Sequence, residues 1–260
     1  MPARDLALLT DAAYAAGDIA RRYWRKNAEI WDKPGDAGPV TEADLAVNDM
    51  LIKKLGKARP DYGWLSEETP DTHYRLGAAR TFIVDPIDGT RAFIAGEKTF
   101  SHSLAIAEHG QIVAAVVYLP IYDTLYAATH DGPATCNGQR ITASVKSDAK
   151  DATLLTARSS MGAEHWVNAS PPPFKREFRA SLAYRLCLVA EGRYDAMLTL
   201  RRTWEWDIAA GDLIARQAGA KVTDQAGADL VYNVADPRTQ GVIAAPELLW
   251  QVLQSGLRLP

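Results

Sequence analysis

The sequence predicts an α/β protein built from two sub-domains that meet near residue 148. Two observations lead to this fold class. Between residues 81 and 128, short β-rich runs separated by turn residues indicate an antiparallel meander. Beyond residue 150, strand-like and helix-like segments alternate, which is typical of a mixed α/β arrangement. We therefore expect an N-terminal α+β domain over residues 1–148 and a C-terminal α/β domain over residues 149–260.

Two helices are expected before the meander. Apolar residues recur at helical spacing over residues 4–25, which predicts an amphipathic helix. Thr41 resembles an N-cap with Asp44 three residues later, so a second helix should run to about Lys57. The meander strands are expected at residues 81–84, 103–107, 112–118 and 124–128. Asn137-Gly138 then predicts a hairpin turn.

The second half predicts alternating elements. Strands are expected at residues 153–157, 195–200, 221–223 and 241–245, with helices at 181–191 and 208–218. Gly192 and Gly219 stand where these helices should end. Pro246 fits the first position of a final helix.

Composition excludes several functional classes. The chain has 260 residues, of which 47% are apolar and 23% charged, and its net charge is −3. That balance gives no basic surface for a nucleic-acid polymer. The sequence has no run of about 18 apolar residues, which a membrane-spanning helix would need. The cysteines, Cys136 and Cys187, fit no metal or redox spacing and indicate a reducing compartment, so we expect a cytoplasmic protein.

The hexapeptide Asp85-Pro86-Ile87-Asp88-Gly89-Thr90 is the most informative motif. It follows the apolar run 81–84, so we expect a strand that leads directly into a loop carrying two carboxylates. Asp85, Asp88 and the carbonyl of Ile87 offer the oxygen ligands that hard divalent cations prefer. The amides of Gly89 and Thr90 should open a short helix suited to a phosphate. In isolation, the same residues are also compatible with an ordinary surface turn.

Other acidic residues lie at element starts or in loops, where their side chains can converge. Glu67 and Glu68 follow a predicted loop, and each could instead be merely solvated. Asp44 could only complete the capping box with Thr41. Asp207 could be only a helix N-cap. None of these acids belongs to a regular helical charge ladder.

Together these residues indicate metal-assisted phosphate chemistry. Two cations could clamp the attacking and leaving oxygens of a phosphoryl displacement, with Asp85 as the bridging carboxylate. Thr90 could pass a proton from the attacking water to Asp44, which would act as the base. His102 and His109 are expected to be structural or solvated. No Cys or His stands in a nucleophile-like setting, so direct attack by water is expected.

The motifs in combination resemble the inositol monophosphatase superfamily of lithium-sensitive, magnesium-dependent phosphatases. The matching segments, in order along nearly the whole chain, are Lys33 with Pro39–Asp44, Ser66–Glu68, Asp85–Thr90 and Trp206–Gly211. One departure is Ser66, where the family usually has glycine.

The resemblance implies a layered αβαβα sandwich of the inositol monophosphatase and fructose-bisphosphatase type. It implies two or three Mg²⁺ ions: Glu67, Asp85 and the Ile87 carbonyl would hold one, and Asp85, Asp88 and Asp207 a second. Glu67 would help with a third. The implied catalytic residues are Asp44, Thr90 and Glu67. A homodimer is one expected assembly, because dimers are common among relatives.

The substrate is expected to be a small phosphorylated metabolite. The stretch before Trp206-Asp207 contains Arg201 and Arg202 but no acid before Glu205, which suits a second phosphate better than a polyol. Together with the segment Ser181–Gly192, this stretch is most similar to the CysQ-type 3′(2′),5′-bisphosphate nucleotidases. That resemblance implies adenosine 3′,5′-bisphosphate as the substrate. The expected substrate contacts are Ile87, Asp88, Gly89, Thr90, Asp207, Arg202 and Arg158.

Four alternatives stay open at this point. The same site could hydrolyse inositol-1-phosphate or histidinol phosphate. A protein of another class, a non-catalytic regulator that binds metal or phosphate, would also carry such acids. Arg201 and Arg202 could equally form a solvated, charged turn.

Overall fold

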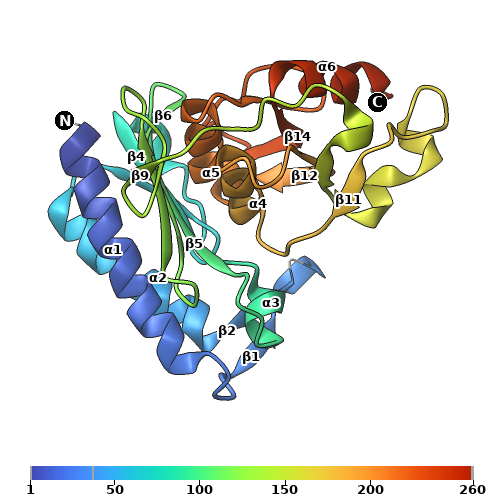
Figure 1. Ribbon diagram of the computed structural model, residues 1–260. Coiled ribbons are helices and arrows are strands. Elements are labelled where there is room, and N and C mark those ends of the chain that lie inside the picture. Colours follow the sequence, from blue (N-terminus) through green and yellow to red (C-terminus); the bar gives the residue numbers. More distant parts are fainter. Residues whose placement is uncertain (1, 37, 259–260) are drawn as a thin grey trace.

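The computed structural model describes residues 2–36 and 38–258. Their helices and sheets stack in five layers (Figure 1). Helices α1 (Pro2–Tyr23) and α2 (Glu42–Ala58) cover the outer face of a seven-stranded sheet. Helices α4 (Leu182–Ala190) and α5 (Glu205–Gln217) fill the space between this sheet and a five-stranded one, whose far side carries α6 (Glu247–Gly256). The layered αβαβα fold implied by the sequence is therefore confirmed.

The seven-stranded sheet contains the expected meander. Its order is β3-β4-β5-β6-β7-β8-β9, antiparallel except for the parallel pair β3 and β4. At its end Asn137 and Gly138 both have positive φ, as a tight hairpin turn requires. The strands are β3 (Gly63–Ser66), β4 (Arg80–Asp88), β5 (Ser101–Glu108), β6 (Gln111–Leu119), β7 (Thr124–Thr129), β8 (Thr135–Cys136) and β9 (Gln139–Arg140).

Strand β4 is longer than expected, which corrects the loop predicted at Asp85. It continues through Asp88, and its pairing with β5 shifts register between Asp85 and Asp88. Pro86, which has no N–H to donate, lies in this interruption. The carbonyl of Pro86 accepts a hydrogen bond from His102 Nδ1 at 2.5 Å. The two carboxylates thus lie on an irregular strand end rather than on a free loop.

The five-stranded sheet has the order β11-β10-β12-β14-β13. Strand β10 runs parallel to both of its neighbours, and the remaining pairs are antiparallel. Strand β12 reaches Trp204, beyond the expected end at residue 200, and α5 begins at Glu205 rather than at 208. Pro246 is the N-cap of α6, one position before the expected N1. The strands are β10 (Thr153–Leu155), β11 (Lys175–Glu177), β12 (Ala196–Trp204), β13 (Lys221–Thr223) and β14 (Arg238–Ala245).

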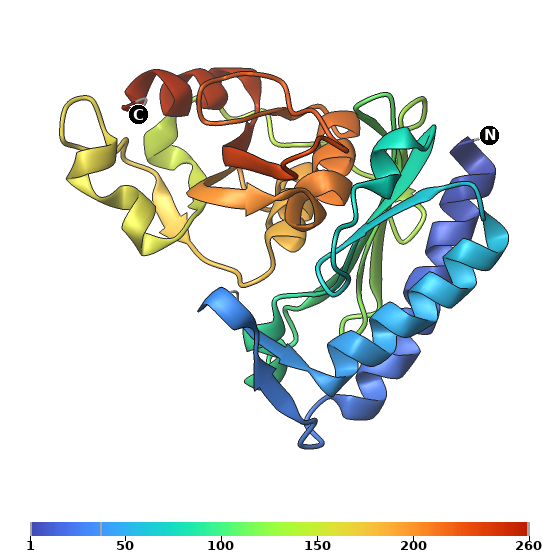
Figure 2. The same ribbon diagram turned by 180° about the vertical axis from the view of Figure 1, so that it is seen from behind.

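The largest hydrophobic cluster forms where α4 and α5 pack between the sheets. A second cluster lies between the seven-stranded sheet and the helices α1 and α2, which run side by side (Figure 2). No helix in the described part of the chain is long and apolar enough to cross a membrane. The small elements are β1 (Ile30–Asp32), β2 (Pro39–Thr41), α3 (Thr90–Ile94) and the 3₁₀ turns Pro34–Asp36, Tyr74–Gly77, Ala149–Asp151, Arg158–Met161 and Ala163–His165.

Candidate active site

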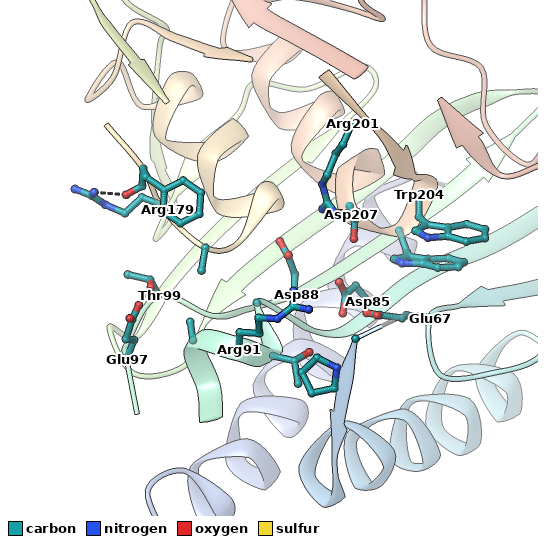
Figure 3. A pocket seen from close by; sticks show the side chains of 18 of the residues that line it. Glu67, Asp85, Asp88, Arg91, Glu97, Thr99, Arg179, Arg201, Trp204 and Asp207 are labelled. Atoms are coloured by element: carbon teal, nitrogen blue, oxygen red, sulfur yellow. Dashed lines mark hydrogen bonds and ion pairs between the residues drawn. The ribbon is translucent and has the colours of Figure 1, made fainter. Parts of the chain in front are cut away.

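A polar pocket of about 760 Å³ opens where the end of β4 meets α4 and α5. Four acidic side chains gather at its centre, with Arg179 and Trp204 on opposite sides of them (Figure 3): Glu67, Asp85, Asp88 and Asp207. The lining residues are Gly38, Pro39, Glu67, Asp85, Asp88, Gly89, Thr90, Arg91, Ala92, Glu97, Thr99, Tyr122, Phe178, Arg179, Ala180, Arg201, Trp204, Trp206 and Asp207.

Three buried aspartates form the centre of the pocket. Asp85 and Asp88 come from the end of β4, and Asp207 comes from the first turn of α5. One carboxylate oxygen from each lies within 4.8 Å of the others. Trp204, not Asp207, is the N-cap of α5, so the interpretation of Asp207 as only a cap is wrong. Three acids buried this closely require a positive partner or protons.

Asp85 is the most constrained of the three. Its side chain is buried, and its Oδ1 has no hydrogen-bond partner in the described structure. Burial raises its pKa well above the usual value, and the charges of Glu67, Asp88, Asp207 and Asp44 raise it further. A buried carboxylate oxygen without a donor is suited to a cation.

Asp88 uses its two oxygens differently. Its Oδ2 accepts hydrogen bonds from Ser181 Oγ (2.6 Å) and from the backbone N–H of Ala183 (2.7 Å) at the start of α4. Burial raises the pKa of Asp88 to about 6, and these two bonds act in the opposite direction. Asp88 is thereby fixed by one oxygen and leaves the other for the cluster.

Asp207 has a high proton affinity for an aspartate. Burial, followed by the charge of Asp88, raises its pKa to about 8, and Arg201 partly offsets the shift. Arg201 Nη2 donates to Asp207 Oδ2 at 3.3 Å, although its own side chain is 65% exposed. This arginine therefore reaches from the solvent-exposed wall toward the acidic centre (Figure 3).

Glu67 and Glu68 share a lysine. Lys33 Nζ lies 2.8 Å from Glu67 Oε1 and 2.6 Å from Glu68 Oε1. Only 5% of the Glu68 side chain is exposed, so the interpretation of these acids as merely solvated is wrong for Glu68. Burial raises the pKa of Glu68 to about 7, and the hydrogen bond from Lys33 opposes this shift. Of the two, Glu67 lines the pocket.

Asp44 completes the helix cap and also contacts Thr90. Its Oδ2 accepts the backbone N–H of Thr41 (2.8 Å) and the Thr41 hydroxyl (2.5 Å), which completes the predicted capping box. Its Oδ1 accepts from Thr90 Oγ1 at 3.3 Å. The Thr90 hydroxyl also lies 3.2 Å from the Ile87 carbonyl. Burial raises the pKa of Asp44 to about 6.

The backbone at the strand end depends on glycine. Gly89 has a φ of 97° and is the N-cap of α3. A Cβ at this position would make only ordinary van der Waals contacts, 3.5 Å from Phe100 Cα and from the backbone nitrogen of Ser181, so the positive φ is what favours glycine here. Gly89 therefore allows β4 to turn sharply into α3 while the α4 segment packs against the turn.

Ser66, the departure from the expected glycine, is accommodated within β3. Its hydroxyl donates to Asn48 Oδ1 at 2.8 Å, and the Glu68 N–H points to the same hydroxyl at 3.4 Å. The added side chain therefore joins α2 to the segment that carries Glu67.

The residues present fit a hard divalent cation. The cluster offers only carboxylate oxygens, it contains an unpartnered buried oxygen on Asp85, and its acids are close enough to raise one another's pKa. Mg²⁺ binds in proteins through one or two such carboxylates together with water and substrate oxygens.

Comparison with known proteins agrees with this geometry. The family model described as inositol monophosphatase family matches residues 2–257. The chain belongs to the inositol monophosphatase family. It is therefore a phosphoric monoester hydrolase, and the family is metal-dependent.

Both inositol monophosphatases and bisphosphate nucleotidases are similar to this phosphatase over most of its length. An inositol-1-monophosphatase from Mesorhizobium japonicum is 33% identical, with 98% of this chain and 96% of the relative covered. The 3′(2′),5′-bisphosphate nucleotidase CysQ from Escherichia coli is 34% identical, with 76% and 81% covered. Among solved structures, the extragenic suppressor protein suhB from Bartonella henselae has a TM-score of 0.83 at 30% identity, covering 96% and 97% of the two chains.

Two residues predicted to bind substrate lie elsewhere in this phosphatase. Arg202 is not among the residues that line the pocket, and its guanidinium pairs with Asp236 on the surface. Arg158 is exposed on a 3₁₀ turn and is also absent from the lining. Because β12 shifts register between Thr199 and Arg202, it is Arg201 that reaches the pocket.

The sequence interpretation also missed several wall residues. Arg91 directly follows the hexapeptide, and that adjacency was a usable signal. Phe178, Arg179 and Tyr122 come from segments with no recognisable motif, so only the fold could bring them to the pocket. Ser181 could have been identified as the N-cap of α4, but not as a donor to Asp88.

Proposed function

We propose that this phosphatase is a Mg²⁺-dependent phosphomonoesterase that removes the 3′-phosphate from adenosine 3′,5′-bisphosphate. The observation that carries the proposal is the buried cluster of Asp85, Asp88 and Asp207, which has an unpartnered oxygen on Asp85 and shares its pocket with Thr90, the hydrogen-bond donor to Asp44. Such a combination suits a phosphate ester that is attacked directly by water.

The proposed ligands are Glu67, Asp85, the Ile87 carbonyl, Asp88 and Asp207, for two or three ions. When bound, Mg²⁺ would neutralise charge on the phosphate and make water a stronger nucleophile at neutral pH. Asp88 keeps its orientation because Ser181 and Ala183 hold its other oxygen. We propose that the backbone amides of Gly89 and Thr90 position the phosphate at the turn into α3.

Thr90 and Asp44 supply the proton path. The Thr90 hydroxyl can donate to Asp44 while accepting a proton from the attacking water, so the proton passes to Asp44 Oδ1. A carboxyl group with a pKa of about 6 is suited to this role, because a general base works best when its pKa lies near the working pH. A protein that only binds phosphate would have no need of this pair.

Two features support a second phosphate on the substrate rather than a polyol. Arg201, Arg91 and Arg179 all line the pocket, and guanidinium groups bind phosphate oxygens well. Glu205, the acid nearest to the Trp206-Asp207 motif, is buried and accepts the backbone N–H groups of Asn233 and Val234. Glu205 is not among the residues that line the pocket, so it gives an inositol ring no acidic contact there.

Phosphate release tests the proposal directly. Purified protein is incubated with adenosine 3′,5′-bisphosphate or with inositol-1-phosphate, each with Mg²⁺ and with EDTA. We expect Mg²⁺-dependent release with a kcat/KM at least tenfold higher for the bisphosphate. A tenfold preference for inositol-1-phosphate would leave the proposed mechanism intact and contradict the proposed substrate. Inositol-1-phosphate is the second candidate because an inositol-1-monophosphatase matches this chain over nearly its whole length. If neither substrate is cleaved, histidinol phosphate would be assayed next.

Binding without turnover on any of the three phosphomonoesters would contradict the proposed catalysis. It would favour the regulator, which predicts stabilisation of the fold by Mg²⁺ and phosphate alone.

A further inference from the structure

Phe178 is an exposed aromatic residue on the wall of the pocket. Its side chain is 48% exposed although it lines a concave site. A single exposed apolar ring is ordinary on a protein surface, but this ring lines a concave pocket, where a bound ligand can cover it. The metal chemistry gives this ring no role.

One face of the Phe178 ring is already covered. The Arg185 guanidinium carbon lies 4.4 Å from the ring centroid, so the guanidinium stacks against that face. Arg185 is itself only 5% exposed, and its Nε donates to the Arg179 carbonyl at 2.5 Å. Arg185 therefore supports the ring from one side, while nearly half of Phe178 remains exposed in the pocket wall.

The other aromatic residues of the pocket are less suitable for stacking. Trp204 already has two stacking partners, Trp206 at 4.5 Å and the Arg238 guanidinium at 4.9 Å from its ring centroid. Tyr122 is exposed and lines the pocket, but the described structure gives its ring no aromatic or cationic stacking partner. Phe178 alone in this lining combines an exposed ring with a single stacking partner that supports it.

Phe178 also lies at a suitable distance from the acidic cluster. Ser181, three residues further along, donates to Asp88. Three residues of extended chain span at most about 10 Å. A nucleoside attached to a phosphate at the cluster can therefore reach the ring through its ribose.

We propose that Phe178, held by Arg185, is the platform on which the base of a nucleotide substrate stacks, and hence a specificity-determining residue. The inference rests on the proposed function and deepens it. Base–aromatic stacking is sequence-tolerant, because every base has a π-face. A cyclitol gains little here, because the ring offers no hydrogen-bond partner for its hydroxyls.

The test compares Phe178→Ala, Phe178→Trp and the wild type. For each, kcat/KM is measured on adenosine 3′,5′-bisphosphate and on glycerol 2-phosphate, which has no base, with Mg²⁺ present. Inhibition constants are measured for adenosine 5′-phosphate and for inorganic phosphate. We expect Phe178→Ala to lose about tenfold in kcat/KM on the bisphosphate, mainly through KM, and to change less than twofold on glycerol 2-phosphate.

The inhibition constants separate stacking from a merely structural role. Phe178→Ala should weaken the binding of adenosine 5′-phosphate about tenfold and the binding of inorganic phosphate less than twofold. Phe178→Trp should restore the binding of adenosine 5′-phosphate. Tyr74→Ala is the matched control, since Tyr74 is 92% exposed and lies outside the pocket lining. Equal losses on both substrates, unchanged nucleotide kinetics, or a nucleotide effect for Tyr122→Ala alone would overturn the proposal. A wild type that cleaves neither substrate would instead contradict the proposed function.

Discussion

At the scale of single residues, the site depends on hydrogen bonds that give each acid a different task. Asp44 has one oxygen in a helix cap and the other on Thr90, whereas Asp88 has one oxygen on α4 and the other directed to the cluster. Asp85 has an oxygen with no protein partner at all in the described structure. These differences make the roles separable by substitution.

Thr90→Ala should reduce turnover without a large effect on binding. It removes the hydroxyl that links the attacking water to Asp44 Oδ1. We expect kcat to fall by roughly 10²-fold or more, with KM within about threefold of the wild type. Thr90→Ser keeps the hydroxyl and should retain most of the activity. An unchanged kcat in Thr90→Ala would remove this residue from the mechanism.

Arg201 and Arg202 form a natural pair of variant and control. Arg201 lines the pocket beside Asp207, whereas Arg202 pairs with Asp236 outside it. Arg201→Ala should raise KM for adenosine 3′,5′-bisphosphate by about tenfold and KM for a monophosphate by less, because one charge-assisted contact is lost. Arg202→Ala should leave both values within twofold. Steady-state kinetics on the two substrates would refute this assignment if the two variants behaved alike.

His102 should make the fold sensitive to acid. Burial lowers its pKa from 6.5 to about 4, so between these values the unfolded chain binds a proton that the folded chain does not. Stability is therefore lost as pH falls from 6.5 toward 4, by about 2 kcal/mol between pH 7.5 and pH 5. Urea unfolding at both pH values should show this extra loss in the wild type relative to His102→Gln. Parallel pH dependence in the two proteins would contradict it.

At the scale of elements, the contact between α4 and α5 positions two of the three clustered aspartates. Helix α4 holds Asp88 at its N-terminus, and α5 carries Asp207 in its first turn. Gly211 allows the close approach, because a Cβ there would lie 2.6 Å from Leu186 Cβ and 3.2 Å from the Ala183 carbonyl. The spacing of these helices therefore influences the spacing of the ligands.

Gly211→Ala should destabilise the protein. The added methyl group has no space, so the helices must separate, at a cost of about 1–3 kcal/mol. Gly56→Ala is the matched control: Gly56 is exposed within α2, and a Cβ at this position would have no neighbour within 4 Å. That substitution should stabilise by roughly 0.5–1 kcal/mol. Urea midpoints that move in the same direction for both variants would contradict the packing argument.

At the scale of the whole molecule, the acidic cluster lies where the two sheets meet through the α4–α5 layer. Asp85 and Asp88 belong to the seven-stranded sheet, and Asp207 follows shortly after β12 of the five-stranded sheet. Charge repulsion within the cluster works against this packing in the absence of metal. A bound cation would reverse that effect.

Mg²⁺ should therefore raise the unfolding temperature of the wild type. At a concentration of 100 times Kd the gain is about 2.7 kcal/mol, or roughly 5 °C for a chain of this size. Asp85→Asn should show little Mg²⁺-dependent shift, although without metal it should be at least as stable as the wild type, because a buried charge is removed. Thermal unfolding with EDTA and with Mg²⁺ measures both. An equal shift in the two proteins would exclude Asp85 as a ligand.

The sequence alone determined those features of this protein that depend on interactions between residues close together in the chain. The capping box at Thr41, the hairpin turn at Asn137-Gly138 and the order of meander strands depend on neighbouring residues and were predicted correctly. The hexapeptide 85–90 supplies an acid pair and a glycine turn within six residues, so the phosphatase family could also be inferred before the fold was seen.

Only the tertiary structure decided which distant side chains meet. Successive residues of a strand face opposite sides, so the register shift in β12 determines that Arg201, not Arg202, lines the pocket. The bonds from Ser181 to Asp88 and from Lys33 to Glu67 join residues 93 and 34 positions apart. Contacts across such separations depend on how whole elements pack, and no local pattern encodes them.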